Sequence, residues 1–351
     1  MGRQLSNIIA GLLLESAVAL NFSTLVVFGD SYTDNGVHTY SPDVNGTVGT
    51  PIPKKSVTST GGRVWAEYVG QYSGAHIYDY AVSGAVCDKT MAPRRNGVSQ
   101  NQVAAFLEDN LYVSNTTGEG ALVNPPDETV YAIWIGTNDI GNGGFLTEVQ
   151  QPNTLPLTSY IDCAFDQFDR LYEVGARKFV LMNVAALDLA PQYALPQNGG
   201  LNSSQYWTDK LLYDTNITHS SEKMREYSTL ANAVYEYRLP YEVEIVKRYP
   251  GSWFALFDVH SLFENIRSSP SSYLNGTAPL NVTGWVAACK NSTCPDLAAR
   301  DSYMWYDELH PSEQTDRVVA REFVNAVLGQ SNWTTYWGET AGSNSFSDRA
   351  V

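Results

Sequence analysis

The chain has 351 residues, enough for one large or two medium-sized domains, and its 43% hydrophobic and 12% aromatic residues are typical of a protein with a buried core. This composition excludes an intrinsically disordered chain. The net charge of -15 argues against nucleic acid as a partner, because its phosphates would be repelled, and favours a neutral or cationic substrate or an acidic working medium.

The first 19 residues contain the three parts of a secretory signal peptide in order. Arg3 precedes the apolar run 8–14, and the small-residue pattern Ala17-Val18-Ala19 follows. We therefore predict cleavage after Ala19 and a secreted, extracellular protein; the alternative is an amphipathic N-terminal helix. The apolar run is shorter than the roughly 20 residues that cross a bilayer, so we expect no permanent membrane anchor.

Five short apolar segments alternate with helical patterns along the rest of the chain. The strands are predicted over 24–28, 76–80, 129–135, 178–183 and 253–259, and the helices over about 61–69, 100–110, 157–174, 221–247 and 312–328. The connections 32–62, 185–220 and 268–302 are expected to be irregular, and the tail 331–351 to be flexible. This alternation predicts an α/β fold with a central parallel sheet.

Cysteines and glycosylation motifs also favour export. The four cysteines are even in number and lack the C-x-x-C spacing of metal or redox sites, so we expect disulfide bonds. Cys289 and Cys294 would close the shortest loop and leave Cys87 with Cys163, but the sequence alone permits three connectivities. The N-glycosylation pattern Asn-x-Ser/Thr occurs at Asn21, Asn45, Asn115, Asn202, Asn216, Asn275, Asn281, Asn291 and Asn332.

Ser31 follows the first predicted strand, where the chain must turn. A serine hydroxyl is a weak nucleophile at neutral pH and becomes useful where it is exposed to substrate and within reach of a base. In open parallel sheets, ligands bind beyond the carboxyl ends of the strands. Gly84 and Asn138 also lie just past such ends, so this topology would bring all three residues to one edge of the sheet.

Five histidines are candidates for the base that would activate Ser31. His310 follows Asp307 by three residues, a spacing at which a loop can fold the carboxylate back onto the imidazole and orient it. In the competing pair, Asp258 and His260 are two residues apart, about 7 Å along a strand and beyond hydrogen-bonding reach. We therefore prefer His310 and interpret His260 as a polar residue at a strand end. Taken alone, the segment around His310 would be a solvated acidic loop with a chance histidine.

Acyl transfer also requires donors aimed at the developing oxyanion. Gly84 lacks a Cβ, so its N–H can approach a substrate closely, and Asn138 offers an amide donor. Taken alone, Gly84 is more simply a turn glycine, and Asn138 an Asx turn or a helix cap. Because such donors suffice for the charge on a carbonyl oxygen, and no cluster of His, Cys and carboxylates has metal spacing, we expect neither metal nor cofactor.

Together these segments resemble the four blocks of the GDSL or SGNH hydrolase family, in the family's order: Gly29-Asp30-Ser31, Gly84, Gly136-Thr137-Asn138-Asp139 and Asp307-x-x-His310. The resemblance spans residues 26–325. It implies a three-layer α/β/α sandwich related to flavodoxin, with one esterase domain over 20–330. It also implies that Ser31 is the nucleophile, His310 the base and Asp307 its orienting acid, with an oxyanion hole of the Ser31 N–H, the Gly84 N–H and Asn138.

Two features near these blocks resemble motifs of other enzyme classes. The G-x-S-x-G elbow of the α/β-hydrolases is absent, and Asp30, beside Ser31, is expected to hold the turn by hydrogen bonds rather than to serve as the catalytic acid. The segment Gly141-Asn142-Gly143-Gly144 lacks the register of a phosphate-binding loop and is expected to be a flexible loop beside the site.

Within the family, the secretory features and the segment 61–65 (Gly-Gly-Arg-Val-Trp) make the chain similar to fungal acetylesterases of carbohydrate esterase family 16, which deacetylate hemicellulose oligosaccharides. A small-molecule or oligosaccharide ester is the substrate that this similarity implies. Sugar rings could stack on aromatic residues near the blocks, although such residues are more often core: Tyr32, Trp65, Trp134, Trp305 and Tyr306. Two alternatives stay open, namely a GDSL lipase or phospholipase-type acylhydrolase with a wide apolar groove and a non-catalytic secreted binding protein.

Overall fold

The computed structural model describes residues 22–36, 58–92, 94, 96–150, 153–277, 279–287 and 299–339. The predicted signal peptide, the cysteines Cys289 and Cys294, and the tail beyond residue 339 lie outside these ranges. Within the described residues, no helix combines the length and the apolar character needed to cross a membrane.

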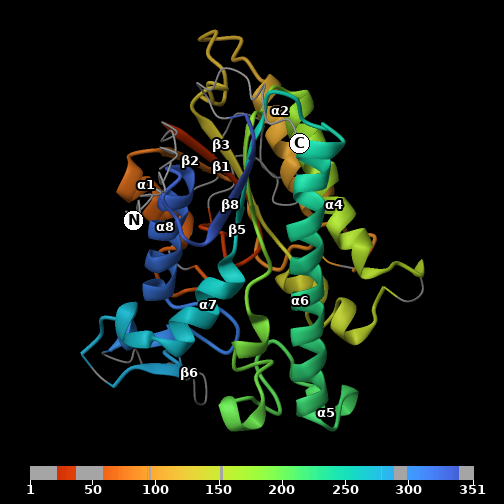
Figure 1. The fold of residues 1–351 in the computed structure, drawn as a ribbon, viewed down its shortest axis with the longest axis vertical. Coiled ribbons are helices and arrows are strands. Elements are labelled where there is room, and N and C mark those ends of the chain that lie inside the picture. Colours follow the sequence, from red (N-terminus) through yellow and green to blue (C-terminus); the bar gives the residue numbers. More distant parts are fainter. Residues whose placement is uncertain are drawn as a thin grey trace, which may run out of the picture.

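A six-stranded sheet forms the centre of the molecule (Figure 1), in the order β2-β1-β3-β4-β5-β8. Its strands are β1 (Thr24–Gly29), β2 (His76–Asp79), β3 (Thr129–Trp134), β4 (Lys178–Met182), β5 (Trp253–Phe257) and β8 (Thr334–Gly338). β1 to β5 are parallel, in the order of the flavodoxin-like fold, and β8 adds an antiparallel edge. All residues of β1 and β3 are buried, as their continuous apolar sequences predict. The expected α/β fold is confirmed.

Helices cover both faces of the sheet and complete three layers (Figure 1). On one face α1 (Trp65–Ser73) packs against α8 (Glu313–Val327), and on the other lie α2 (Val103–Leu111), α4 (Leu157–Glu173) and α6 (Ile217–Pro240). The remaining helices are α3 (Thr137–Ile140), α5 (Lys210–Tyr213) and α7 (Val259–Ser268). Side chains that accept a hydrogen bond from a first-turn N–H begin α6, α7 and α8: Asn216, Asp258 and Ser312.

Two expectations for the C-terminal third are wrong. The segment 334–338, predicted as flexible tail, forms β8, whose Tyr336 lies opposite Ala255 of β5 and donates a hydrogen bond to the Ala326 carbonyl. Trp333, Tyr336 and Trp337 pack against the core, and these aromatic residues outweigh the polar composition of the tail 331–351 as a whole. Within 268–302, predicted as irregular, β6 (Asn281–Trp285) forms a two-stranded parallel sheet with β7 (Tyr303–Trp305).

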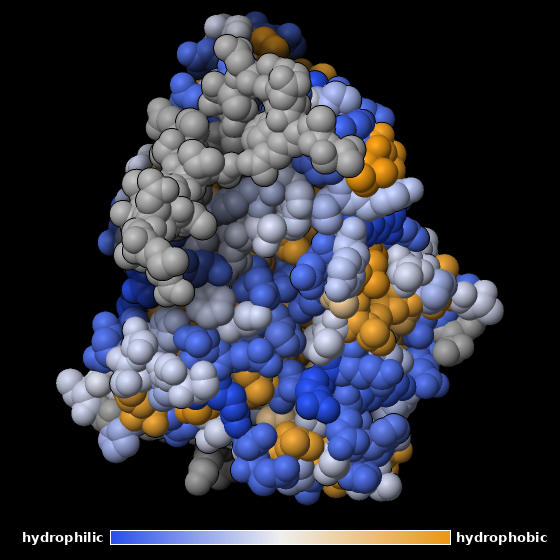
Figure 2. Space-filling model, viewed as in Figure 1, coloured by the Kyte–Doolittle hydropathy of each residue, from blue (hydrophilic) through white to orange (hydrophobic). Residues whose placement is uncertain are grey.

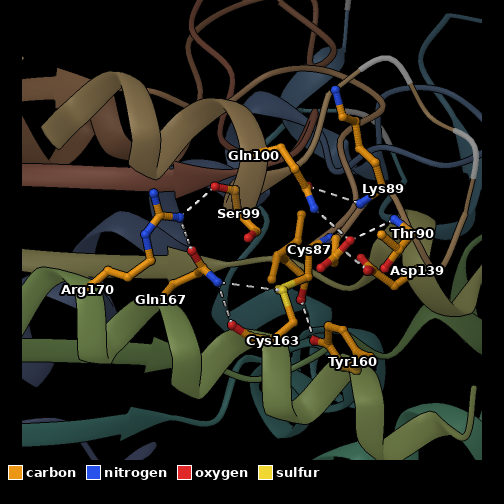
Figure 3. The surroundings of a disulfide bond; sticks show 12 residues. Cys87, Lys89, Thr90, Ser99, Gln100, Asp139, Tyr160, Cys163, Gln167 and Arg170 are labelled. Atoms are coloured by element: carbon orange, nitrogen blue, oxygen red, sulfur yellow. Dashed lines mark hydrogen bonds between the residues drawn. A yellow bond between two sulfur atoms is a disulfide. The ribbon is translucent and has the colours of Figure 1, made fainter. Parts of the chain in front are cut away.

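A disulfide bond between Cys87 and Cys163 ties the loop after β2 to α4 (Figure 3). Both cysteines are buried, and the Cys87 N–H donates a hydrogen bond to Oδ1 of Asp139. This pairing belongs to one of the three disulfide connectivities that the sequence permits. It fixes the loop that carries Gly84 from one side, while α3 holds it from the other.

Replacing both Cys87 and Cys163 by alanine should lower the free energy of unfolding by about 2–4 kcal/mol, because the bond joins residues 76 positions apart and restricts the unfolded chain. Urea unfolding of the wild-type protein and the double variant measures this difference. Equal unfolding midpoints with equal slopes would contradict it.

Candidate active site

Three side chains from opposite ends of the chain meet beyond the carboxyl end of β1. Nε2 of His310 lies 2.8 Å from Oγ of Ser31, and Nδ1 of His310 lies 2.9 Å from each carboxylate oxygen of Asp307. The exposed fractions of Ser31, Asp307 and His310 are only 5%, 3% and 4%. In this arrangement an imidazole can take the proton of a serine hydroxyl while a carboxylate fixes its tautomer.

A tight turn between β7 and α8 places Asp307 against His310. Oδ1 of Asp307 accepts hydrogen bonds from the N–H groups of Leu309 and His310, so the turn folds the carboxylate back onto the imidazole three residues later. Burial acts to raise the pKa of Asp307, but the charge of His310 and hydrogen bonds from His310 and Tyr206 outweigh it and lower this pKa below the ordinary value. Asp307 is therefore a carboxylate at neutral pH.

The turn that carries Ser31 is held by the neighbouring Asp30. Oδ1 of Asp30 accepts the Tyr32 N–H at 3.0 Å, and the Asp30 carbonyl accepts the N–H groups of Thr33 and Asp34. This hydrogen bonding is the role expected for Asp30. The buried side chain of Gln102, which the sequence did not single out, bonds both the N–H and the carbonyl of Gly29 and so fixes the end of β1.

The loop with Gly84 is clamped between the segments that carry Ser31 and Asn138. Asp34, three residues after Ser31, accepts hydrogen bonds from the N–H and hydroxyl of Ser83 on one carboxylate oxygen. Gly84 has a φ of 80°, and a Cβ added there would meet no described atom within 4 Å. A side chain at Gly84 would therefore be excluded by the backbone conformation, which favours glycine, and not by crowding.

Asn138 lies in α3, directly after the turn at Gly136. Its Nδ2 donates one hydrogen bond, to the Ala85 carbonyl at 2.9 Å, and the second amide hydrogen remains for another acceptor. Gly136 has a φ of 133°, and a Cβ there would lie 2.6 Å from the Tyr160 hydroxyl. Only glycine permits this turn, which brings Asn138 to the loop of Gly84.

The aromatic residues expected to bind sugars are instead part of the core. The exposed fractions are 1% for Tyr32, 0% for Trp65, 3% for Trp134 and 0% for Trp305. A ring without an exposed face is poorly placed to stack on a sugar, so the burial of these four residues favours the core interpretation that the sequence also offered. Tyr306 remains half-buried, against Gly61.

The segment 61–65 packs against the start of α8 rather than lining the site. A Cβ on Gly62 would lie 2.4 Å from the Glu313 carboxyl carbon, and Glu313 accepts the Arg63 N–H and the Tyr68 hydroxyl. The small residues of this segment therefore let α1 approach α8.

The segment 141–144 lies beside the site but is not a loose loop. Oδ1 of Asn142 accepts hydrogen bonds from Gln192 and Tyr193, and its Nδ2 donates to the Tyr206 carbonyl. The hydroxyl of Tyr206 in turn donates to Oδ2 of Asp307 at 2.7 Å. No sequence pattern pointed to Tyr206, which lies in the connection predicted as irregular.

His260 stands apart from Ser31, at the start of α7. Its Nδ1 lies 3.3 Å from the Val184 carbonyl, and its Nε2 lies 3.8 Å from Glu264. Asp258 caps α7 through the Ser261 N–H and bonds Asn183 instead of orienting His260. The choice of His310 over His260 as the partner of Ser31 agrees with this geometry.

Comparisons with known proteins point to one family. The model of the family described as GDSL-like Lipase/Acylhydrolase matches residues 25–323. An acetylesterase of Hypocrea jecorina is 39% identical over 325 residues, which cover 90% of this chain and 92% of that one. An acetylesterase of Thermothelomyces thermophilus is 25% identical over 87% of this chain and 88% of that one. A solved lipolytic G-D-S-L family protein of Veillonella parvula, 12% identical, covers 86% of this chain and 95% of that one with a TM-score of 0.35, too low to carry an argument.

Two carboxyl groups are buried beneath the site, on Asp30 and Asp139. Burial raises the pKa of Asp30 to about 6 and that of Asp139 to about 7. A hydrogen bond from Cys87 opposes the rise at Asp139, and the charge of Asp30 adds to it. Oδ2 of Asp139 has no hydrogen-bond partner among the described residues. The folded protein therefore binds a proton at Asp139 more tightly than the unfolded chain does.

The stability of the wild-type protein should fall as pH rises from about 4 through 7, because Asp139 must then ionise inside the folded protein. Asp139→Asn mimics the protonated carboxyl and does not titrate. The melting temperature of this variant relative to wild type should therefore increase over the same range. Thermal unfolding between about pH 4 and 8 measures it.

The matched control is Asp209→Asn, at an exposed position, whose melting temperature should differ from that of wild type by a constant amount across the range. A difference between Asp139→Asn and wild type that does not change with pH would contradict the prediction.

Proposed function

We propose that this chain, which belongs to the GDSL-like lipase/acylhydrolase family and is a carboxylic ester hydrolase, is a secreted enzyme that removes acetyl groups from hemicellulose-derived oligosaccharides. The observation that carries the proposed chemistry is the hydrogen-bonded chain from Ser31 through His310 to Asp307. It joins a nucleophile, a base and an orienting carboxylate within one buried cluster.

In the proposed reaction, Oγ of Ser31 attacks the ester carbonyl while Nε2 of His310 takes its proton. The negative charge that forms on the carbonyl oxygen is stabilised by the N–H groups of Ser31 and Gly84 and by the free amide hydrogen of Asn138. His310 then gives its proton to the leaving alcohol, and an acyl-enzyme on Ser31 remains. Water, activated by His310, releases the acid and restores Ser31.

Two observations support a preference for acetyl esters of sugars. They are the similarity to acetylesterases and the surface around the proposed catalytic triad of Ser31, His310 and Asp307. Both acetylesterase relatives match most of the chain. Several partly or fully exposed residues on the loops beside the triad are polar or small, which suits a hydroxyl-rich leaving group: Ser83, Gly84, Asn138 and Gln205. On the face drawn in Figure 2, hydrophobic residues form separate patches among hydrophilic ones, as on the surfaces of most globular proteins.

Secretion is supported by two features of the described residues. The disulfide bond between Cys87 and Cys163 is typical of proteins from oxidising compartments. Five glycosylation motifs have an exposed asparagine, so a glycan could attach without disturbing the core: Asn115, Asn202, Asn216, Asn275 and Asn332.

Ser31→Ala and His310→Ala should each lower kcat for p-nitrophenyl acetate by at least about 10⁴-fold, because each removes a member of a unit that acts together. The control is His219→Ala, which removes an exposed histidine that also pairs with an aspartate, Asp214, and should retain full activity. Circular dichroism checks the fold of each variant. A fluorophosphonate probe should label Ser31 in the wild-type protein; retained activity in either variant would reassign that role.

The wild-type enzyme should cleave p-nitrophenyl acetate with a kcat/KM more than about tenfold above that for the octanoate ester, because each extra methylene must fit a pocket made for acetyl. Acetylated xylo-oligosaccharides should also be deacetylated, as measured by release of acetate. A preference for octanoate and longer esters would instead identify a lipase-type acylhydrolase.

A further inference from the structure

Tyr206 lies against the two residues that activate Ser31, although it is distant from them in sequence. Its hydroxyl donates a 2.7 Å hydrogen bond to Oδ2 of Asp307, 101 residues away. Its ring packs edge-on against the imidazole of His310, with ring centroids 5.1 Å apart and planes at 80°. The residue as a whole is 40% exposed, so Tyr206 reaches from the surface to the buried carboxylate.

The backbone around Tyr206 is held independently of its hydroxyl. Asn142 donates to the Tyr206 carbonyl, and Gln205 donates to the carboxylate of Glu308, next to Asp307. In the same connection between β4 and α6, the Gln192 N–H donates to the Glu308 carbonyl. The connection is therefore bonded to the turn of Asp307 at two points, Gln192 and Gln205. Removing only the hydroxyl of Tyr206 would leave this anchoring in place.

We propose that Tyr206 is a positioning residue for the triad, whose hydroxyl fixes the second carboxylate oxygen of Asp307 and whose ring holds His310 aimed at Ser31. This inference rests on the proposed esterase function of the same site. It adds to the triad a residue from the connection between β4 and α6.

The hydrogen bonds to Asp307 explain why a fourth side chain is needed. Oδ1 accepts two N–H groups from its own turn, whereas Oδ2 is bonded by His310 and Tyr206 alone among the described residues. Asp307 is 3% exposed, so water is a poor substitute for the hydroxyl. A hydrogen bond to a buried carboxylate is among the stronger ones in proteins.

The state of Tyr206 suits a permanent donor. Burial raises the pKa of Tyr206, and the nearby charges of Asp307 and Glu308 raise it further, so the hydroxyl keeps its proton at any working pH. The titratable groups that face this part of the site are His310, Glu308, Tyr306, Tyr32 and, through His310, Asp30. Tyr206 and His310 are the two that donate to the Asp307 carboxylate through their side chains.

Tyr206→Phe removes the hydroxyl and keeps the ring. We expect kcat for p-nitrophenyl acetate to fall about tenfold with little change in KM, because one charge-assisted hydrogen bond that orients the base is lost. The acidic side of the pH profile of kcat/KM should move to higher pH. Without the hydrogen bond from Tyr206, the Asp307 carboxylate stabilises the protonated form of His310 more strongly. A purely structural role would alter neither the profile nor kcat in the folded variant.

Tyr213→Phe, at a half-exposed position on nearby α5, is the matched control and should behave as wild type. The proton NMR signal of the hydrogen on His310 Nδ1, which lies in the hydrogen bond to Asp307, gives a readout that does not depend on turnover. Its position should move in Tyr206→Phe and stay unchanged in Tyr213→Phe.

The two proposals fail in different ways. An unaltered kcat, pH profile and Nδ1 signal in Tyr206→Phe, with an active wild-type enzyme, would overturn the role of Tyr206 alone. A wild-type protein without esterase activity would overturn the proposed function, and the NMR signal would still report whether Tyr206 acts on the pair of Asp307 and His310.

Discussion

The buried carboxylate of Asp307 is the group on which the site depends. Burial alone would raise its pKa, and a neutral carboxyl would hold the imidazole of His310 only weakly. Two N–H groups of its own turn, the ring of His310 and the hydroxyl of Tyr206 together keep it ionised. The donors come from a local turn and a distant connection, so the loss of hydration on burial is fully compensated only in the assembled protein.

The parallel sheet supplies the other half of the arrangement. Ser31, Gly84 and Asn138 follow the neighbouring strands β1, β2 and β3, whose carboxyl ends share one edge. Short side-chain bonds then join their loops: Asp34 to Ser83, and Asn138 to the carbonyl beside Gly84. The disulfide at Cys87 fixes the same loop to α4 (Figure 3). The loops that carry Ser31, Gly84 and Asn138 are thus held in place by hydrogen bonds and a disulfide bond.

Features with a local signal could be predicted from the sequence, and features set by distant contacts could not. The continuous apolar runs of β1 and β3 mark strands buried on both faces, and the three-residue spacing of Asp307 and His310 marks a carboxylate that can fold back. β8 was missed because the short strand-forming run 333–337 lies in a tail rich in Ser, Gly and Asn, and its pairing with the distant β5 leaves no local signal. Tyr206 carries no local pattern, since its partner lies 101 residues away. Trp65 and Trp305 were open to two interpretations, core or sugar site, with core favoured, and their burial agrees with the core.

The bond between Ser31 and His310 spans 279 residues. His310 is followed directly by α8, which packs on α1 near the other end of the chain. A chain emerging from the ribosome therefore carries its serine long before its base exists, and the two meet only when α8 docks as the last helix to be made. With Ser31 and His310 in the roles proposed, newly synthesised protein is inert towards esters until its synthesis is almost finished, and a chain cut short before residue 310 lacks the base for its serine.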